Sequence, residues 1–147
     1  MTDISASYLE KSIRAVIQQY INSKKVAHGE FCGEGLCFDI TCGWCRAVAF
    51  VVQEYFGGNV YEARFSYTKA SRYGCHWNNH VWNIVDGSIL DMTKKQFPPL
   101  FPYQELVTNG FGSRPQEITR EEYLSNPLRR RAYNQLFHNV VLSVEKK

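Results

Sequence analysis

The pair Asp86-Gly87 separates two short apolar runs, residues 80–85 and 88–92, and this arrangement is typical of a β-hairpin. A two-residue turn of this kind needs positive φ at both central positions, which Asp and Gly tolerate better than most residues. The chain must therefore contain an antiparallel pair of strands here. No alternation of strand, helix and strand surrounds the hairpin, so a parallel doubly wound sheet is not expected.

The hairpin also predicts which side chains meet. A two-residue turn places Val85 opposite Ser88, and the same register makes His80 and Asp91 diagonal neighbours on one face of the sheet. Diagonal neighbours are roughly 7 Å apart at the backbone, which is within reach of a histidine side chain. A carboxylate in that place can accept a hydrogen bond from one imidazole nitrogen and leave the other nitrogen free as a base.

Helical and alternating periodicities, together with turn residues, predict the other elements. In the first part of the chain they are a helix over 7–22, an irregular loop over 24–41, a buried helix over 45–56 that ends at Gly57-Gly58, and a strand around 61–67. After the hairpin come a Pro- and Gly-rich loop over 97–112 and a helical tail. The tail opens with a capping box at 119–122 and reaches about 144, with a break near Pro127. This order indicates an α+β fold in which helices pack against an antiparallel sheet. Because no linker or repeat divides the 147 residues, we expect one domain over residues 1–147.

Composition argues against several classes of protein. Hydrophobic residues make up 44% of the chain and charged residues 21%, which is typical of a globular protein rather than a disordered one. The longest apolar run, residues 47–52, is too short for a membrane-spanning helix. The net charge of +3, without a dense Lys/Arg stripe, argues against a nucleic-acid partner. Because the N-terminus shows no apolar signal segment and the five cysteines are odd in number, we expect a cytoplasmic protein without a disulfide framework.

Cys45 stands at the start of the predicted buried helix, directly after Gly43-Trp44. A helix N-terminus stabilises a thiolate through its dipole and its free N–H groups, and a nearby imidazolium does so further. The same N–H groups can stabilise the oxyanion that forms when a thiolate attacks a carbonyl. Although each residue alone is often purely structural, Cys45, His80 and Asp91 together form a candidate nucleophile, base and orienting acid.

The sequence around these residues resembles known families. The segment 43–49 (GWCRAVA) resembles the nucleophile segment of transglutaminases, G-x-C-x-x-x-A, and the segments 79–83 (NHVWN) and 90–93 (LDMT), with Gln96, resemble their histidine and aspartate strands. The likeness is closer to the small bacterial YunG-like family of the transglutaminase-like and papain-like cysteine protease superfamily. It extends over residues 40–140 and includes the segments 51–58 (VVQEYFGG) and 90–97 (LDMTKKQF).

The resemblance implies a papain-like fold, the transglutaminase core, in which a buried helix carries the nucleophile of a Cys-His-Asp triad. We expect acyl transfer on an amide or ester (hydrolysis, deamidation or transamidation), with a peptide, a protein or a small amide as substrate and no cofactor or metal; the resemblance gives the chemistry but not the substrate. Trp44 and Trp82 are assigned to the substrate and oxyanion site. Papain-like enzymes often carry a Gln six residues before the nucleophile, where this chain has Asp39, so the second oxyanion donor is not identified.

Three alternatives stay open at this point. Cys42 and Cys45 form a C-x-x-C at a helix start, as in thiol-redox proteins, but no apolar strand precedes it. Cys32 and Cys37, with that pair and His76, could hold zinc, although their spacing is not that of paired zinc knuckles. The third alternative is a catalytically inactive binding module on the same fold.

Two other groups of residues receive a structural interpretation. His76 has the same strand parity as His80, but only His80 lies beside Asp91 in the hairpin register. Residues 129–131 (RRR) are expected to form a solvated helix face rather than a phosphate site. Cys75 and the other cysteines outside the candidate triad are assigned no role, and the oligomeric state is left open.

Overall fold

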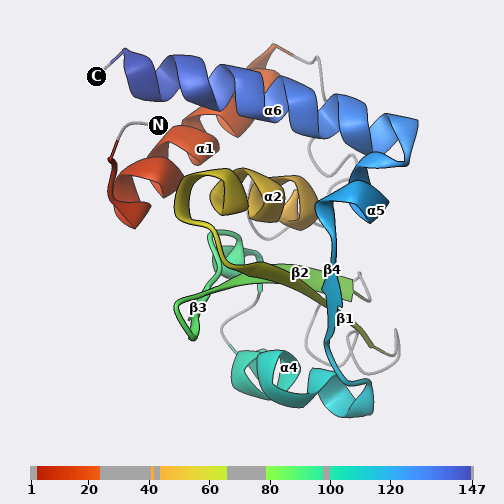
Figure 1. Cartoon of the computed structure of the whole chain (residues 1–147). Coiled ribbons are helices and arrows are strands. Elements are labelled where there is room, and N and C mark those ends of the chain that lie inside the picture. The colour runs from red at the N-terminus through yellow and green to blue at the C-terminus, as the bar shows by residue number, and fades with distance from the viewer. Residues whose placement is uncertain (1–2, 24–40, 42–43, 66–78, 98–99, 147) are drawn as a thin grey trace.

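The structure, a computed structural model, describes residues 3–23, 41, 44–65, 79–97 and 100–146. In chain order its elements are α1 (Ala6–Asn22), α2 (Cys45–Phe56), β1 (Asn59–Arg64), β2 (Asn79–Val85), β3 (Ser88–Leu90), the 3₁₀ helix η1 (Lys94–Gln96), α4 (Tyr103–Asn109), the 3₁₀ helix η2 (Gly110–Gly112), β4 (Gln116–Ile118), α5 (Arg120–Leu124) and α6 (Pro127–Glu145). Helices α1, α2 and α6 cover one face of the sheet, and α4 lies on the other face (Figure 1). The predicted α+β class is confirmed.

The sheet is antiparallel throughout, with strand order β3-β2-β1-β4. Val85 pairs with Ser88, as the Asp-Gly turn predicts. Asp86 has a φ of 51° and Gly87 a φ of 78°, so both turn residues adopt the left-handed conformation that a two-residue hairpin requires. The register of the hairpin is therefore confirmed.

Helix α2 is the central helix of the fold, and its middle residues from Ala47 to Val52 are buried. It ends at Gly57, whose φ of 71° is in the left-handed region. A Cβ at the next residue, Gly58, would lie 2.3 Å from the backbone oxygen of Ile84 in β2. The two glycines thus let the chain leave α2 and enter β1 directly beside β2. The predicted end of the helix at Gly57-Gly58 is confirmed.

The predicted helices over 7–22 and 45–56 are confirmed, and so is the capped helical tail. Thr119 accepts a hydrogen bond from the backbone N–H of Glu122 and caps α5, and the break near Pro127 separates α5 from α6. Of the predicted loop over 24–41, residues 24–40 lie outside the described residues. The predicted strand around 61–67 is β1, which begins earlier, at Asn59, and ends at Arg64; residues 66 and 67 lie outside the described residues. A single domain over 1–147 stays a prediction.

Two local predictions were wrong, and one strand was missed. The loop predicted over 97–112 contains α4, because Pro102 precedes that helix and Gly110, with a φ of 61°, ends it; the residues that indicate a loop are the helix boundaries. Strand β4 was not predicted, since three residues are too few to show alternation. Strand β3 ends at Leu90 rather than Met92, because the Asp91 side chain bonds to the backbone N–H of Thr93 and starts a turn.

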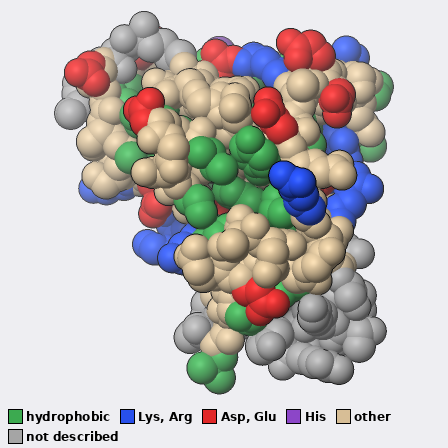
Figure 2. Space-filling view, turned by 60° about the horizontal axis from the view of Figure 1, so that its bottom comes forward, with side chains coloured by type: hydrophobic (Ala, Val, Ile, Leu, Met, Phe, Trp, Pro, Cys, Tyr) green, Lys and Arg blue, Asp and Glu red, His purple; other side chains and the backbone are tan. Residues whose placement is uncertain are grey.

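The buried side chains form two clusters, one on each face of the sheet. The larger cluster lies between the sheet and α1, α2 and α6, and the smaller cluster lies between the opposite face of the sheet and α4 and η2. On the surface drawn in Figure 2, hydrophobic side chains gather at the centre and charged side chains of both signs lie around them. Among the described helices, none is long and apolar enough to cross a membrane.

Candidate functional site

Strand β2 carries polar side chains on both faces of the sheet, because neighbouring residues of a strand alternate. Asn83 faces α2, where its Nδ2 donates a hydrogen bond of 2.8 Å to the backbone oxygen of Ala49. Ala49 lies about one helical turn after Cys45. This buried hydrogen bond therefore fixes the start of α2, with Cys45, against β2. His80 belongs to the other set of alternating positions and packs among the side chains of the smaller cluster.

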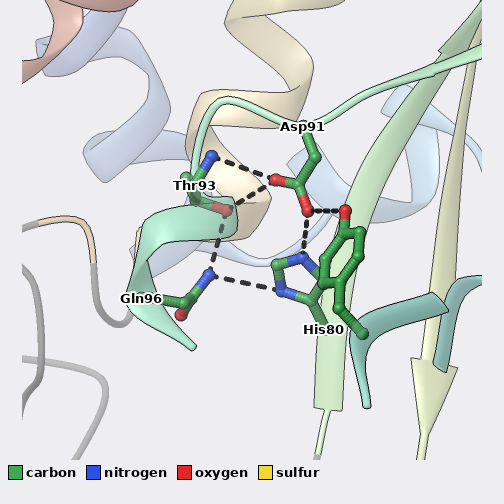
Figure 3. A network of polar contacts seen from close by, with 5 residues as sticks. His80, Asp91, Thr93 and Gln96 are labelled. Atoms are coloured by element: carbon green, nitrogen blue, oxygen red, sulfur yellow. Dashed lines mark hydrogen bonds and ion pairs between the residues drawn. The ribbon is translucent and has the colours of Figure 1, made fainter. Parts of the chain in front are cut away.

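His80 and Asp91 form the centre of a polar network (Figure 3). His80 Nε2 lies 2.6 Å from Asp91 Oδ2, a short distance that is typical of a charge-assisted hydrogen bond. The side chains are 0% and 3% exposed, so water does not compete for this contact. The hairpin register places Asp91 directly after β3, and the pair meets as the turn predicts.

Four donors surround the Asp91 carboxylate. His80 Nε2 and the Tyr103 hydroxyl, from α4, both contact Oδ2. The backbone N–H and the hydroxyl of Thr93 both donate to Oδ1, at 3.0 and 3.1 Å. An ionised carboxylate accepts several hydrogen bonds and donates none, so this set of donors favours the charged form of Asp91 and fixes its orientation.

Gln96 contacts the other nitrogen of the imidazole. Its Nε2 lies 2.9 Å from the Thr93 hydroxyl and 3.3 Å from His80 Nδ1. In this orientation the amide donates to Nδ1 of a neutral ring whose proton is on Nε2. When the ring is charged, Nδ1 becomes a donor instead and needs an acceptor such as a sulfur or an oxygen.

Aromatic rings hold the imidazole in place. The Trp82 ring is stacked at 5.9 Å between centroids, and the Phe97 ring approaches edge-on at 4.6 Å. Together with the bonds to both ring nitrogens, these walls leave His80 one orientation. The site thus combines a fixed base with an apolar, low-dielectric surrounding.

Cys45 is the first residue of α2 and is partly exposed. Its side chain acts on His80 through a hydrogen bond and through its charge, so the thiol lies beside the imidazole. The residue before it, Trp44, is the N-cap of α2. Its side chain makes no capping hydrogen bond, because an indole N–H donates and cannot accept from the backbone N–H groups of the helix. The structure therefore brings together all three residues of the candidate triad, with the thiol at the helix start, the imidazole at the start of β2 and the carboxylate after β3.

The charges of the pair follow from its surroundings. Burial lowers the pKa of His80, but the charge of Asp91, its hydrogen bond and the nearby Cys45 outweigh burial and raise the pKa to about 9. Burial raises the pKa of Asp91, but the charge and hydrogen bond of His80, with the bonds from Tyr103 and Thr93, hold it below its ordinary value. His80 is therefore an imidazolium and Asp91 a carboxylate at neutral pH. In this state Nδ1 donates, and its acceptor is the Cys45 sulfur or the Gln96 side-chain oxygen after the amide has rotated.

This pair makes protein stability depend on pH. A histidine whose pKa rises from 6.5 to about 9 on folding contributes stability that is complete below pH 6.5 and is lost as the pH rises through 9. We expect the free energy of unfolding to fall by about 3 kcal/mol over this range. Denaturant unfolding between pH 6 and 10 measures the loss, and an NMR titration of the His80 ring should show a midpoint near 9.

The matched control for this expectation is His138→Gln, which removes an exposed histidine on α6 and should leave the pH dependence unchanged. A His80→Gln variant should show a flatter profile than the wild type wherever it folds. An NMR midpoint near the ordinary value of 6.5 for His80 would contradict the charged pair.

The other sequence-predicted site residues are placed as follows. Trp44 is 2% exposed and Trp82 is 1% exposed, so both belong to the interior; a role for either at a substrate or oxyanion site stays a prediction. Apart from Cys45, the residues on which the redox and zinc alternatives depend lie outside the described residues: Cys32, Cys37, Cys42 and His76. So do Cys75 and Asp39, the position of the missing Gln. Among the described residues, no group of three or more His, Cys, Asp or Glu side chains could hold a metal ion.

Three residues of the network, Thr93, Gln96 and Tyr103, were not predicted as site residues. Gln96 stands three residues after Thr93 in a short 3₁₀ segment, and residues at that spacing eclipse one another in a 3₁₀ helix, so a 3₁₀ assignment would have placed them together. No sequence pattern indicated Tyr103, because its helix, α4, was predicted to be a loop. The Tyr103 hydroxyl reaches Asp91 only through tertiary packing.

Comparisons with known proteins give a family but no activity. The family model described as "YunG protein" matches residues 38–144, which include Cys45, His80 and Asp91. The chain is 30% identical over 69 residues to the uncharacterized protein YunG of Bacillus subtilis (strain 168), an alignment that covers 47% of this chain and 51% of that protein. The chain thus spans about half the length of this curated relative. No solved structure matches the chain significantly.

Proposed function

This chain belongs to the YunG family, and we propose that it is a cysteine-dependent acyl-transfer enzyme that acts on an amide or ester carbonyl. Cys45 is the nucleophile, His80 the acid and base, and Asp91 the residue that orients His80. The fold that carries this site is proposed to be the papain-like one that transglutaminases share.

One observation carries this proposal: a buried imidazolium is held by a buried carboxylate, and the thiol that lies beside it is at a helix N-terminus. A structural histidine does not need a carboxylate with four donors to keep it charged. A charged imidazole beside a sulfur favours the thiolate, and so do the N–H groups of the first turn of α2. The arrangement matches what nucleophilic catalysis by cysteine requires.

The reaction follows from these positions. The Cys45 sulfur attacks the carbonyl carbon and forms a C–S bond while the electron pair of the C=O moves to oxygen. As the tetrahedral intermediate collapses, His80 gives its Nδ1 proton to the leaving amine or alkoxide, and an acyl-enzyme remains. Water or a second amine then attacks the thioester, His80 takes up its proton, and the thiolate leaves. Hydrolysis, deamidation and transamidation differ only in the leaving group and the acceptor.

Selective alkylation tests the nucleophile. At pH 7 we expect iodoacetamide to modify Cys45 before the other four cysteines, because an ordinary thiol with a pKa of about 8.5 is only a few per cent ionised there. The modified cysteine is identified by peptide mapping after limited reaction, and urea-unfolded protein, in which all thiols should react at similar rates, is the control.

Preferential alkylation of Cys42 would instead support a thiol-redox protein. If Cys45 reacts no faster in the folded chain than in the unfolded one, the thiol is not activated. The binding-module alternative would then be favoured, with Gln96 holding Nδ1 of His80 in a structural role.

A further inference from the structure

We propose that a small arginine-lined pocket beside Cys45 binds a carboxylate group of the substrate, so that the enzyme acts on acyl compounds with a carboxylate close to the reacting carbonyl. This inference rests on the proposed function, since the pocket is assigned as a subsite of the same reaction. The volume of the pocket, its excess of positive charge and its position near Cys45 support the proposal.

The pocket has a volume of about 90 Å³ and lies on the α2 side of the sheet. It is formed where α2, β1, β4, α5 and α6 meet, and its lining residues are Arg46, Glu62, Arg64, Ile118, Glu122, Tyr123 and Arg129. Since one water needs on the order of 10–15 Å³ of such space, the pocket holds several waters, which a carboxylate could displace. Tyr123 is 4% exposed and lies at the base, whereas Arg64 is 75% exposed and lies at the rim.

Three arginines face two glutamates in this pocket, and positive charge is in excess. Glu62, only 9% exposed, uses one carboxylate oxygen for Arg46 and the other for Arg64, the latter at 3.2 Å. Within the described residues, Arg129 has no ion-pair partner, and it is half-buried. Burial and the charges of Arg46 and Arg64 lower the pKa of Arg129, which shows that these cations lie close together.

An additional anion is the natural partner of such a cluster. A guanidinium presents its N–H donors in a planar fork that matches a carboxylate, and Arg129 is available for that contact. The sequence predicts a solvated face for residues 129–131; Arg130 and Arg131 are indeed exposed, but Arg129 turns into the pocket.

The pocket adjoins the proposed nucleophile. Arg46 directly follows Cys45, so their Cα atoms are about 3.8 Å apart. Burial raises the pKa of Tyr123, which lines the pocket, and the charges of Arg46, Arg129 and Cys45 all act on it. The pocket therefore lies close to Cys45, where it can receive a charged group that extends from a substrate bound there.

A matched pair of reagents tests this subsite. Iodoacetyl-glycine and iodoacetyl-glycinamide carry the same electrophile and differ only in a carboxylate against a carboxamide, and each alkylates Cys45 by forming a C–S bond and releasing iodide. In Arg129→Gln, we expect the ratio of the two rates to fall by about three- to tenfold, the scale of one charge-assisted contact at a partly exposed site. The matched control Arg130→Gln removes the same charge from an exposed place on α6 and should keep the wild-type ratio.

A second measurement does not depend on a reactive thiol. Succinate should raise the melting temperature of the wild type and of Arg130→Gln in a saturable way, but not that of Arg129→Gln, and neutral succinamide should raise none of them. Equal rate ratios in the wild type and Arg129→Gln would overturn the subsite while leaving the proposed function intact. If Cys45 is unreactive, the proposed function fails, and the succinate result alone decides whether the pocket binds a carboxylate.

Discussion

Replacing Cys45 with alanine is expected to abolish covalent labelling by an acyloxymethyl ketone probe, because the sulfur supplies the atom that forms the bond and no neighbouring side chain can replace it. The same variant should lose all turnover of any substrate that the probe competes with. Labelling is read by intact-protein mass spectrometry, in which the wild type gains one adduct and the Cys45→Ala variant gains none.

The variant should remain folded. Cys45 is only partly buried and begins α2, and alanine is the best helix former, so we expect the free energy of unfolding to change by no more than about 1 kcal/mol. Circular dichroism and denaturant unfolding check this. A Cys45→Ala variant that is still labelled once at the wild-type rate would show that another cysteine is the nucleophile.

The core of the site could be predicted because its parts are local in sequence. Two turn residues, Asp86 and Gly87, determine the register of a short hairpin, and that register determines which side chain meets His80. The start of α2 at Cys45 follows equally from a short apolar run between glycines. Such features depend on neighbouring residues, and so a single sequence contains enough information to find them.

The surroundings of the site could not be predicted, because they come from tertiary packing. Tyr103 reaches Asp91 from a helix whose boundaries resemble those of a loop. The pocket near Cys45 combines Arg46, Glu62 and Arg129 from α2, β1 and α6, and no periodicity relates them. The residues of the proposed chemistry could thus be predicted from the sequence, but those that would select a substrate could not.

Replacing Asp91 with asparagine is expected to slow the reaction by up to about 10⁴-fold, because an amide offers the imidazole the wrong tautomer and removes the charge that stabilises the imidazolium. In the structure this charge is what keeps the pKa of His80 at about 9 in spite of burial. The pKa of His80 in Asp91→Asn should therefore fall far below its wild-type value. The probe-labelling rate and an NMR titration of the His80 ring measure the two effects separately.

Asp86→Asn is the matched control. It makes the same chemical change at the exposed hairpin turn, outside the polar network, where asparagine tolerates the positive φ as well as aspartate does. We expect wild-type labelling and a wild-type pKa of His80 in this variant. If Asp91→Asn reacts with the probe at the wild-type rate while the pKa of His80 falls, Asp91 contributes to the charge of His80 but does not orient it for the reaction.

The double variant tests whether the residues act as one unit. Because Cys45→Ala already removes the bond-forming atom, adding Asp91→Asn should cost almost no further activity, so the two losses are strongly non-additive. Additive losses of activity would mean that Asp91 acts on some reaction other than the one at Cys45.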